Sequence, residues 1–387
     1  MKINVVAAFP KHRDGIPRVA EELLKKICEK KQVDSVLIIA RQDLGFVNPS
    51  LLANSKTSLL TTSRFLTPGT LLKIIKLYKN GDFFVVLAPP WDILDPLPEL
   101  YFFLHLIKYG FLPRSKWVQL MHDFIPYVYS EDTGGKRTIK LYNAFRNHLL
   151  EVPVRYVAVS ESTKRDAMRY WGLSADRIAV IRHGSFITPK SPRTNFGSKK
   201  VLIVSDIAPR KNHVRLIKAF ELVHRNNPND DAELIIVGHL RINIPEFESV
   251  LHDIRMRNEH IKITFAGYLT DSEIRSLYDQ ADVFVYPSLY EGFGLPVLEA
   301  MACGCPVITS NVSSLPEVVG EAGILVDPYN VEELAQAMIA VLEDDELKRG
   351  MSRKSIAQAQ KFSWEKAGEA YVSLFTELLD KARQGRD

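Results

Sequence analysis

The feature that most constrains the fold is a repeated alternation of short, apolar, β-branched runs with longer segments of helical periodicity. The predicted strands of the first half are residues 3–8, 35–40, 83–88, 117–121, 156–160 and 178–181. Those of the second half are residues 200–205, 233–238, 261–266, 283–287, 306–309 and 323–326. Several runs are apolar nearly throughout, as in parallel strands that helices cover on both faces. The alternation therefore predicts an α/β protein with two doubly wound domains.

The domain boundaries follow from length and from one irregular segment. The chain has 387 residues, whereas an ordinary domain has about 150. Residues 188–198 are rich in Pro and Ser and lack periodicity, which indicates a linker. We expect domains over residues 1–190 and 199–363. An amphipathic C-terminal helix over residues 364–387 is expected to pack back on the first domain.

Composition limits the class of protein. Hydrophobic residues make up 46% and charged residues 25% of the chain, which is typical of a globular protein. The sequence contains neither the roughly 20 consecutive apolar residues of a transmembrane helix nor a signal-peptide pattern, so we expect a cytoplasmic protein. The three cysteines, Cys28, Cys303 and Cys305, suit neither a disulfide framework nor a zinc site and are expected to be buried and inert.

Charge is distributed unevenly. Lys and Arg outnumber Asp and Glu by 29 to 17 in residues 1–195, and Asp and Glu outnumber them by 29 to 21 in the remainder. A basic half favours an anionic partner such as a lipid phosphate, a membrane surface or an acidic glycan. The alternative is ordinary variation in surface composition. Residues 65–79 and 100–116 combine apolar, aromatic and basic side chains, which suits peripheral membrane contact, core helices or a subunit contact.

The strongest chemical signal is the stretch from Tyr286 to Ala300. An apolar strand is followed by Glu-Gly-Phe-Gly-Leu-Pro at residues 291–296, and Pro296 suits the first turn of a helix. Free N–H groups and the helix dipole at such a start favour a diphosphate, and glycines let its oxygens approach the backbone. Glu291 lies before the turn and Glu299 about one turn into the helix, where each can accept hydrogen bonds from hydroxyl groups.

Residues 287–311, from Pro-Ser-Leu-Tyr-Glu-Gly-Phe-Gly-Leu-Pro to Pro-Val-Ile-Thr-Ser-Asn, resemble the signature of retaining glycosyltransferases of family 4. The resemblance continues through residues 314–319 and 362–364, covers essentially residues 200–380, and is patchier in the first half. It implies the GT-B fold, in which two Rossmann-like domains face each other across a cleft. The first domain would then bind the acceptor and the second the nucleotide-sugar donor.

The resemblance also implies roles for individual residues of the second domain. Glu299 would hold the ribose hydroxyls of the donor, and Glu291 would contact the sugar. The residues expected to line the sugar and the diphosphate are Gly292, Phe293, Gly294 and Leu295. The backbone near Tyr268 would contact the base of the donor; the alternative is a structural role for this turn.

A second motif, Pro-Arg-Lys-Asn at residues 209–212, follows the predicted strand 200–205. Arg210 and Lys211 at a helix start would neutralise a departing diphosphate. The motif is similar to a variant in the family, but relatives usually have Gly where this chain has Ser205, and many have Arg or Thr at Asp206. A carboxylate close to a diphosphate is unfavourable, so Asp206 is expected to turn away or to mark an unusual site.

The first half carries weaker signals. Residues 14–18, Asp-Gly-Ile-Pro-Arg, resemble the glycine loop of the family, which implies that Gly15 and Arg18 contact the donor, although Pro17 stands where relatives often have Gly. His122 and Asp123 follow a predicted strand and resemble a His-Asp pair of the family, which implies that His122 hydrogen-bonds the transferring sugar and that Asp123 belongs to the donor site. A glycine turn without a ligand and a structural histidine are the alternatives.

Together these features predict a retaining, metal-independent hexosyltransferase with catalytic residues His122, Arg210, Lys211 and Glu291. Relatives with the Pro-Arg-Lys-Asn motif favour GDP-mannose as donor, with UDP-sugars open, and a glycan or lipid-linked glycan as acceptor. No cofactor, no metal ion and no nucleic-acid partner are expected, since histidines and carboxylates do not fall at metal-ligand spacings. A nucleotide-sugar epimerase and a catalytically silent sugar-binding subunit remain as alternatives, and oligomerisation stays open.

Overall fold

The computed structural model describes residues 1–6, 15–41, 53–62, 76, 83–86, 117–129, 139, 143, 150, 155–227, 231–240, 244–257 and 260–384. The chain forms two compact units. The first unit is Met1–Gly184 together with Ser363–Asp387, and the second is Ser185–Phe362. Residues 65–75, 77–79 and 100–116, which the sequence suggests for membrane contact or core helices, lie outside the described residues.

Among its described residues, the first unit has one parallel sheet of seven strands in the order β3-β2-β1-β4-β5-β6-β7. The strands are β1 Lys2–Val6, β2 Ser35–Arg41, β3 Thr57–Thr62, β4 Phe83–Val86, β5 Trp117–Met121, β6 Arg155–Ala158 and β7 Ile178–Val180. Val6 of β1 pairs with Ile39 on one side and Val86 on the other. Strand β3 was not predicted, because its Thr-Ser-Leu-Leu-Thr-Thr sequence, at the edge of the sheet, lacks a continuous apolar run.

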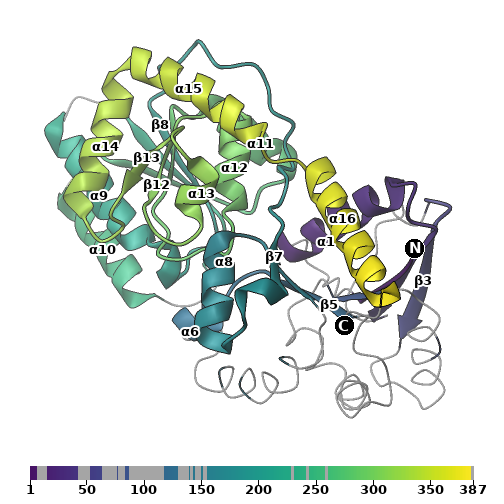
Figure 1. The fold of residues 1–387 in the computed structure, drawn as a ribbon. Helices are drawn as coiled ribbons and strands as arrows, with labels where there is room; N and C mark the ends of the chain where they lie inside the picture. The colour runs from purple at the N-terminus through teal and green to yellow at the C-terminus, as the bar shows by residue number, and fades with distance from the viewer. Residues whose placement is uncertain are drawn as a thin grey trace. The chain divides into compact units, whose positions relative to one another are not determined.

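The described helical segments of the first unit are α1 Gly15–Glu29, α6 Ile125–Val128, α8 Glu161–Asp166, the π-helical turn η3 Ala167–Trp171, η4 Ala175–Arg177 and α16 Trp364–Arg383. Helix α16 comes from the end of the chain and packs along α1 (Figure 1). A Cβ on Gly368 of α16 would lie 2.8 Å from Cβ of Lys26, so the two helices touch at their backbones here. Lys30 adds ion pairs to Glu365 and Glu369.

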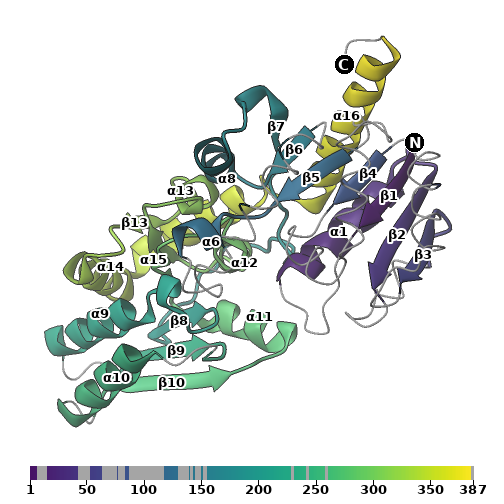
Figure 2. The same cartoon turned by 90° about the horizontal axis from the view of Figure 1, so that it is seen from below.

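Among its described residues, the second unit has a parallel sheet of six strands in the order β10-β9-β8-β11-β12-β13. Figure 2 shows β10, β9 and β8 side by side. The strands are β8 Lys200–Val204, β9 Glu233–Val237, β10 Lys262–Gly267, β11 Val283–Tyr286, β12 Val307–Ser310 and β13 Ile324–Val326. The helical segments are η5 Pro209–Lys211, α9 His213–Asn226, α10 Pro245–Arg257, α11 Asp271–Gln280, α12 Leu295–Ala302, α13 Leu315–Val319, α14 Val331–Glu343 and α15 Asp345–Ala359.

The order of these strands determines where a ligand can bind. The chain runs outward from β8 to β10 and then returns to place β11 on the other side of β8. Such a reversal is a topological switch point, and open α/β sheets bind ligands outside the carboxyl ends of the strands at this point. The loops that follow β8 and β11 therefore form the expected binding edge of the second unit.

The predicted linker, residues 188–198, has no regular secondary structure but is fixed on the second unit. The buried carboxylate of Asp282 accepts hydrogen bonds from the backbone N–H groups of Gly197 and Lys199, both at 3.0 Å. The ammonium group of the buried Lys348 lies 3.6 Å from the same carboxylate. This segment is therefore an anchored strap rather than a free connection.

The three cysteines are buried, and burial raises the pKa of the Cys303 and Cys305 thiols to about 12. They are neutral packing groups at physiological pH. In the described part of the chain, no helix is long and apolar enough to cross a membrane.

Candidate functional site

The Gly-Phe-Gly turn ends at the start of helix α12. Gly294 has φ 107° and ψ 47°, a left-handed conformation that favours glycine, and Leu295 begins the helix. A Cβ at this position would also lie 3.0 Å from Cδ2 of Leu315. The turn aims the first N–H groups of α12 away from the helix, where they have no partner within it. This helix start suits an anion such as a diphosphate.

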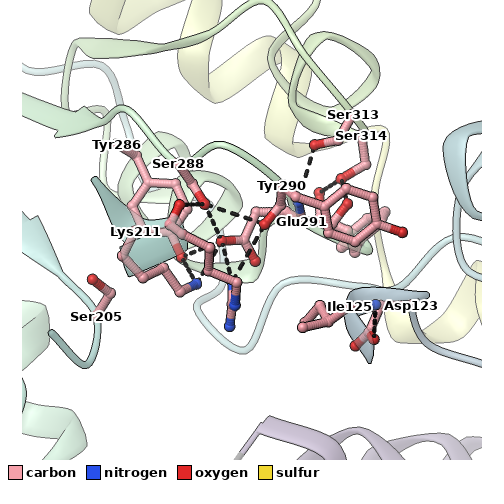
Figure 3. Close-up of polar contacts among 12 residues, drawn as sticks. Asp123, Ile125, Ser205, Lys211, Tyr286, Ser288, Tyr290, Glu291, Ser313 and Ser314 are labelled. Atoms are coloured by element: carbon pink, nitrogen blue, oxygen red, sulfur yellow. Dashed lines mark hydrogen bonds and ion pairs between the residues drawn. The ribbon is translucent and has the colours of Figure 1, made fainter. Parts of the chain in front are cut away.

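Directly before this turn, one oxygen of Glu291 collects four hydrogen bonds (Figure 3). Its Oε1 atom accepts from Nζ of Lys211 at 2.5 Å and from Nη1 of Arg210 at 3.0 Å. It also accepts from the hydroxyls of Ser288 at 2.7 Å and Tyr286 at 3.2 Å. The other oxygen, Oε2, is outside this network. The Glu291 side chain is only 11% exposed, so the two cations and the carboxylate meet almost out of water.

Burial and charge together set the pKa values of this group. Burial alone would raise the pKa of Glu291, but the charges of Lys211 and Arg210 outweigh it and hold the pKa at about 2. Burial and the neighbouring Arg210 lower the pKa of Lys211 to about 8, against the pull of Glu291. Both partners are charged at neutral pH. Since the network has two cations and one carboxylate, it carries a net positive charge that favours an anionic ligand.

The positions of the two cations depend on Asn212. This residue has φ 63°, which asparagine tolerates better than most residues, and it ends the 3₁₀ turn that carries Arg210 and Lys211. Its Nδ2 donates to the carbonyl oxygens of Pro287 at 3.0 Å and Pro328 at 2.7 Å. The backbone carbonyl of Arg210 accepts from the N–H of Leu289 at 2.7 Å. The bonds to Pro287 and Leu289 tie the loop after β8 to the loop after β11, and the bond to Pro328 ties it to the turn after β13.

A third loop holds the other side of Glu291. The backbone N–H of Glu291 donates to Oγ of Ser313 at 3.0 Å. The hydroxyl of Ser314 is buried and lies 3.0 Å from the carbonyl of Glu291 and 2.8 Å from that of Phe293. The path of residues 291–293 is therefore defined by side chains from the segment that precedes α13.

Glu299 lies about one turn into α12 and is partly exposed. Its Oε2 atom accepts a hydrogen bond from the hydroxyl of Tyr278 at 3.3 Å. Tyr278 belongs to α11 and is completely buried. Glu299 and the helix start that follows Gly294 thus belong to the same helix, α12.

Asp206, which is unusual for the motif, has a local partner. Its Oδ1 atom accepts from the backbone N–H of His239 at 3.4 Å, and its charge favours the protonated form of Lys211. A Cβ on Gly238 would lie 2.1 Å from the carbonyl oxygen of Ser205, so the glycine permits this crossing of loops. Tyr268 is 72% exposed, and its ring stacks on that of His239 with centroids 5.8 Å apart.

Four of the predicted residues belong to the first unit. Gly15 opens helix α1 and Arg18 lies in its first turn, while Asp14, the first residue of the proposed glycine loop, lies outside the described residues. His122 follows β5, and its ring lies 5.8 Å from that of His183. Asp123 accepts through Oδ1 from the N–H of Ile125 at 3.0 Å, which gives it a structural part at the start of α6 (Figure 3).

The buried ring of His183 packs in turn on Trp364, with centroids 5.4 Å apart. Burial, with a smaller contribution from His122, holds the pKa of His183 well below its usual range. His183 is therefore a neutral, packed neighbour of His122. Within the first unit, His122 and Asp123 are adjacent, and within the second unit Arg210, Lys211 and Glu291 meet before the turn of residues 292–295.

Sequence reasoning missed the supporting side chains. Tyr286 and Ser288 lie inside the recognised stretch, but nothing in their spacing indicated that both hydroxyls reach one glutamate oxygen. Tyr278 is further away in sequence and belongs to none of the recognised motifs. In the described part of the chain, no cluster of His, Cys, Asp or Glu is arranged to hold a metal ion.

Part of the chain matches a known protein family. Residues 187–358 match the family described as glycosyl transferases group 1. The chain is 35% identical over 221 residues to O-antigen chain mannosyltransferase B of Escherichia coli, covering 54% of this chain and 57% of that protein. It is 29% identical over 286 residues to the serotype-specific mannosyltransferase WbdA of E. coli, covering 70% of this chain and 34% of WbdA.

A third relative, D-inositol 3-phosphate glycosyltransferase of Corynebacterium glutamicum (strain R), is 29% identical over 235 residues, covering 57% of this chain and 56% of that protein. The matches span between about a third and somewhat more than half of the length of these curated relatives.

Solved structures establish the fold. Anabaena Alr3699/HepE, in complex with UDP and glucose, matches with a TM-score of 0.71 at 20% identity over 97% of this chain and all of that one. Sucrose-phosphate synthase from Thermosynechococcus elongatus matches with a TM-score of 0.70 at 20% identity over 98% and 99% of the two chains. The chain has the GT-B fold, with one Rossmann-like domain in each unit, as the sequence predicts.

Proposed function

We propose that this chain is a glycosyltransferase that moves a hexose from a nucleoside-diphosphate sugar to a glycan or lipid-linked glycan acceptor, with retention of anomeric configuration. The observation that carries the proposal is the meeting of Arg210, Lys211 and Glu291 in front of the α12 helix start, at the switch point of the second sheet. The match of residues 187–358 to group 1 glycosyl transferases supports it.

The leaving group would bind at the positive end of this site. The bond between the anomeric carbon and the diphosphate oxygen breaks, and its electron pair passes to the diphosphate. Arg210, Lys211 and the N–H groups at the start of α12 stabilise the charge that develops there. Because these groups supply positive charge directly, we propose that transfer needs no metal ion.

Two carboxylates would orient the donor. Glu291 has one oxygen held by its four partners, and we propose that Oε2 accepts a hydrogen bond from a hydroxyl of the transferred sugar. Glu299, which lies in α12, would accept hydrogen bonds from the two ribose hydroxyls. Fixing the reacting carbon relative to an acceptor hydroxyl lowers the entropic part of the barrier.

Retention is proposed to occur by attack on the face from which the diphosphate departs. The acceptor oxygen forms its bond to the anomeric carbon, and its proton passes to the departing phosphate oxygen. His122 of the first unit would hydrogen-bond the transferring sugar, and Gly15 and Arg18 would contact the donor.

GDP-mannose is the proposed donor. Two relatives are described as mannosyltransferases, one of them for an O-antigen chain, which also supports a polysaccharide or glycoconjugate acceptor. A UDP-sugar is the second candidate, because Alr3699/HepE was solved with UDP and glucose. The excess of Lys and Arg in residues 1–195 supports an anionic acceptor or peripheral contact with the inner face of a membrane.

A panel of nucleotides and nucleotide sugars tests the donor. The melting temperature is measured for the wild type and for Glu299→Ala with GDP, UDP, GDP-mannose and UDP-glucose. A ligand at 100 times its Kd adds about 2.7 kcal/mol of stability, which gives a readable shift. Stabilisation of the wild type alone supports the proposal, whereas no shift with any nucleotide favours a silent subunit.

Turnover is measured separately, as release of the nucleoside diphosphate with and without EDTA. We expect the same rate in both. A rate that EDTA abolishes and Mg²⁺ or Mn²⁺ restores would overturn the metal-independent mechanism. Donor binding without turnover in the presence of an oligomannose acceptor would favour the catalytically silent alternative.

A further inference from the structure

Tyr278 is a buried side chain whose only polar atom points at a residue of the proposed donor site. It lies in α11, is 0% exposed, and places its hydroxyl 3.3 Å from Oε2 of Glu299 in α12. Burial, with the nearby Glu299 charge, holds the pKa of this hydroxyl well above its usual range. The group is therefore an O–H donor at neutral pH.

The ring of Tyr278 is fixed by other aromatic residues. Phe284 of β11 meets it edge to face, with centroids 5.4 Å apart and an interplanar angle of 70°. Phe284 also stacks on Tyr286, at 5.7 Å and 18°. All three side chains are at most 1% exposed. A ring packed in this way has little freedom to rotate, so its hydroxyl has a defined position.

Tyr278, Phe284 and Tyr286 form an aromatic row with a hydroxyl group at each end. The hydroxyl of Tyr286 contacts Glu291, and the hydroxyl of Tyr278 contacts Glu299. The buried row thus connects the two carboxylates to which the proposed function assigns the sugar and the ribose. Glu291 has further partners in Lys211, Arg210 and Ser288, so the loss of one hydroxyl there would be partly compensated.

We propose that Tyr278 is a positioning residue that holds the Glu299 carboxylate in the orientation that binds both ribose hydroxyls. A glutamate side chain has several rotatable bonds, and fixing it before the ligand arrives removes part of the entropic cost of binding. The inference rests on the proposed function, because it requires Glu299 to bind ribose. It predicts that removal of the Tyr278 hydroxyl weakens recognition of the ribose and leaves that of the diphosphate intact.

Isothermal titration of the full chain with GDP and with 2′-deoxy-GDP tests this inference, with UDP and 2′-deoxy-UDP measured in parallel. Hydrogen bonds to charged groups are strong enough that the wild type should bind the ribonucleotide about tenfold more tightly than its 2′-deoxy form. Tyr278→Phe should reduce this ratio to about threefold or less, with the affinity for the 2′-deoxy form unchanged. Glu299→Ala should abolish the preference.

Tyr371→Phe is the matched control. Tyr371 is a buried tyrosine of the first unit, and among the described residues its hydroxyl has no hydrogen-bond partner. This substitution removes a buried hydroxyl without touching Glu299, so the ratio should equal that of the wild type. The double variant Tyr278→Phe/Glu299→Ala adds a thermodynamic cycle, in which Tyr278→Phe should have no effect once Glu299 is absent.

The outcomes separate the inference from the proposed function. If Glu299→Ala loses the ribose preference while Tyr278→Phe retains the wild-type ratio, Tyr278 does not position Glu299 and the proposed function stands. If Tyr278→Phe weakens both nucleotide forms equally, its role is merely structural and the inference fails. If the wild type binds neither GDP nor UDP, or binds ribo and 2′-deoxy forms equally, the ribose assignment of Glu299 fails and the inference with it.

Discussion

Glu291 accepts hydrogen bonds from two cations in a nearly buried position, and this arrangement determines what its replacement should do. Glu291→Gln retains size but leaves the charges of Lys211 and Arg210 without their carboxylate. Because breaking a buried ion pair exposes an uncompensated charge, we expect the free energy of unfolding of the second unit to fall by about 3 kcal/mol. Denaturant unfolding followed by far-UV circular dichroism measures the loss.

The double variant Glu291→Gln/Lys211→Met is the control for this prediction. It removes the partner charge together with the carboxylate and should recover at least half of the lost stability. All four tryptophans, Trp91, Trp117, Trp171 and Trp364, belong to the first unit, so their fluorescence should not change in either variant. A double variant as unstable as Glu291→Gln would contradict the charge argument.

The same carboxylate makes stability depend on pH in a defined window. The folded-state pKa of Glu291, about 2, lies below its ordinary value of 4.5. A depressed pKa means that the charged form is stabilised by folding, so the contribution is complete above about pH 4.5 and is lost as the pH falls towards 2. The shift corresponds to about 3 kcal/mol.

To isolate this group, the free energy of unfolding is compared between the wild type and Glu291→Gln from pH 7 to pH 2.5. The difference should shrink as the pH falls below about 5. Other carboxylates titrate in both proteins and cancel in the comparison. A difference that stays constant down to pH 2.5 would show that Glu291 is not held as a strongly paired carboxylate.

At the scale of elements, the start of α12 depends on the left-handed conformation of Gly294. Gly294→Ala forces a Cβ into φ 107° and to within 3.0 Å of Leu315. We expect a loss of stability of about 1–2 kcal/mol and weaker nucleotide binding, because the turn that aims the α12 N–H groups must shift. Thermal unfolding with and without GDP measures both effects. Gly294→Asn should lose less, since asparagine tolerates this region better, and equal losses would argue against a backbone cause.

The elements of the second unit could be predicted from sequence because each strand is an apolar run followed by a recognisable turn. The pattern of Gly292, Gly294 and Pro296 predicted the start of α12 to within one residue of its first residue, Leu295. Strand β3 could not be found in this way, because an edge strand need not be apolar on both faces.

Contacts between side chains that are distant in sequence were also beyond prediction. The hydroxyl of Tyr278 reaches Glu299, 21 residues later, only because α11 and α12 lie together in the fold. Asp206 looked misplaced near a diphosphate, and its hydrogen bond to the backbone of His239 depends on a loop crossing that Gly238 allows. Residue types predicted the chemistry, whereas the order of strands determines which side chains meet.

At the scale of the whole molecule, the chain leaves the first unit at Ser185 and returns to it at Ser363. The strap of residues 188–198 is fixed to the second unit through Asp282, and α16 is fixed to the first unit through α1. The second unit is thus one continuous segment, while the first unit requires both ends of the chain. Mutations in α16 should therefore act on the first unit, although α16 follows the second unit in sequence.

Two helix glycines turn this assignment into a measurement. Alanine is the better helix former by about 1 kcal/mol, so propensity alone predicts that Gly350→Ala in α15 and Gly368→Ala in α16 both stabilise. A Cβ at Gly350 meets nothing within 4 Å, whereas one at Gly368 would lie 2.8 Å from Cβ of Lys26. We expect Gly350→Ala to raise the stability of the second unit by about 0.5–1 kcal/mol and Gly368→Ala to lower that of the first by about 1–3 kcal/mol.

Tryptophan fluorescence follows the first unit, and the calorimetric transition that GDP shifts identifies the second. Gly368→Ala should lower the unfolding midpoint measured by fluorescence and leave the GDP-sensitive transition unchanged. Gly350→Ala should raise the temperature of the GDP-sensitive transition and leave the fluorescence midpoint unchanged. If Gly368→Ala stabilises the protein, α1 and α16 do not touch at this point. If each variant shifts both transitions together, the two units unfold as one cooperative body. The return of the chain to the first unit at Ser363 then couples the unfolding of one unit to that of the other.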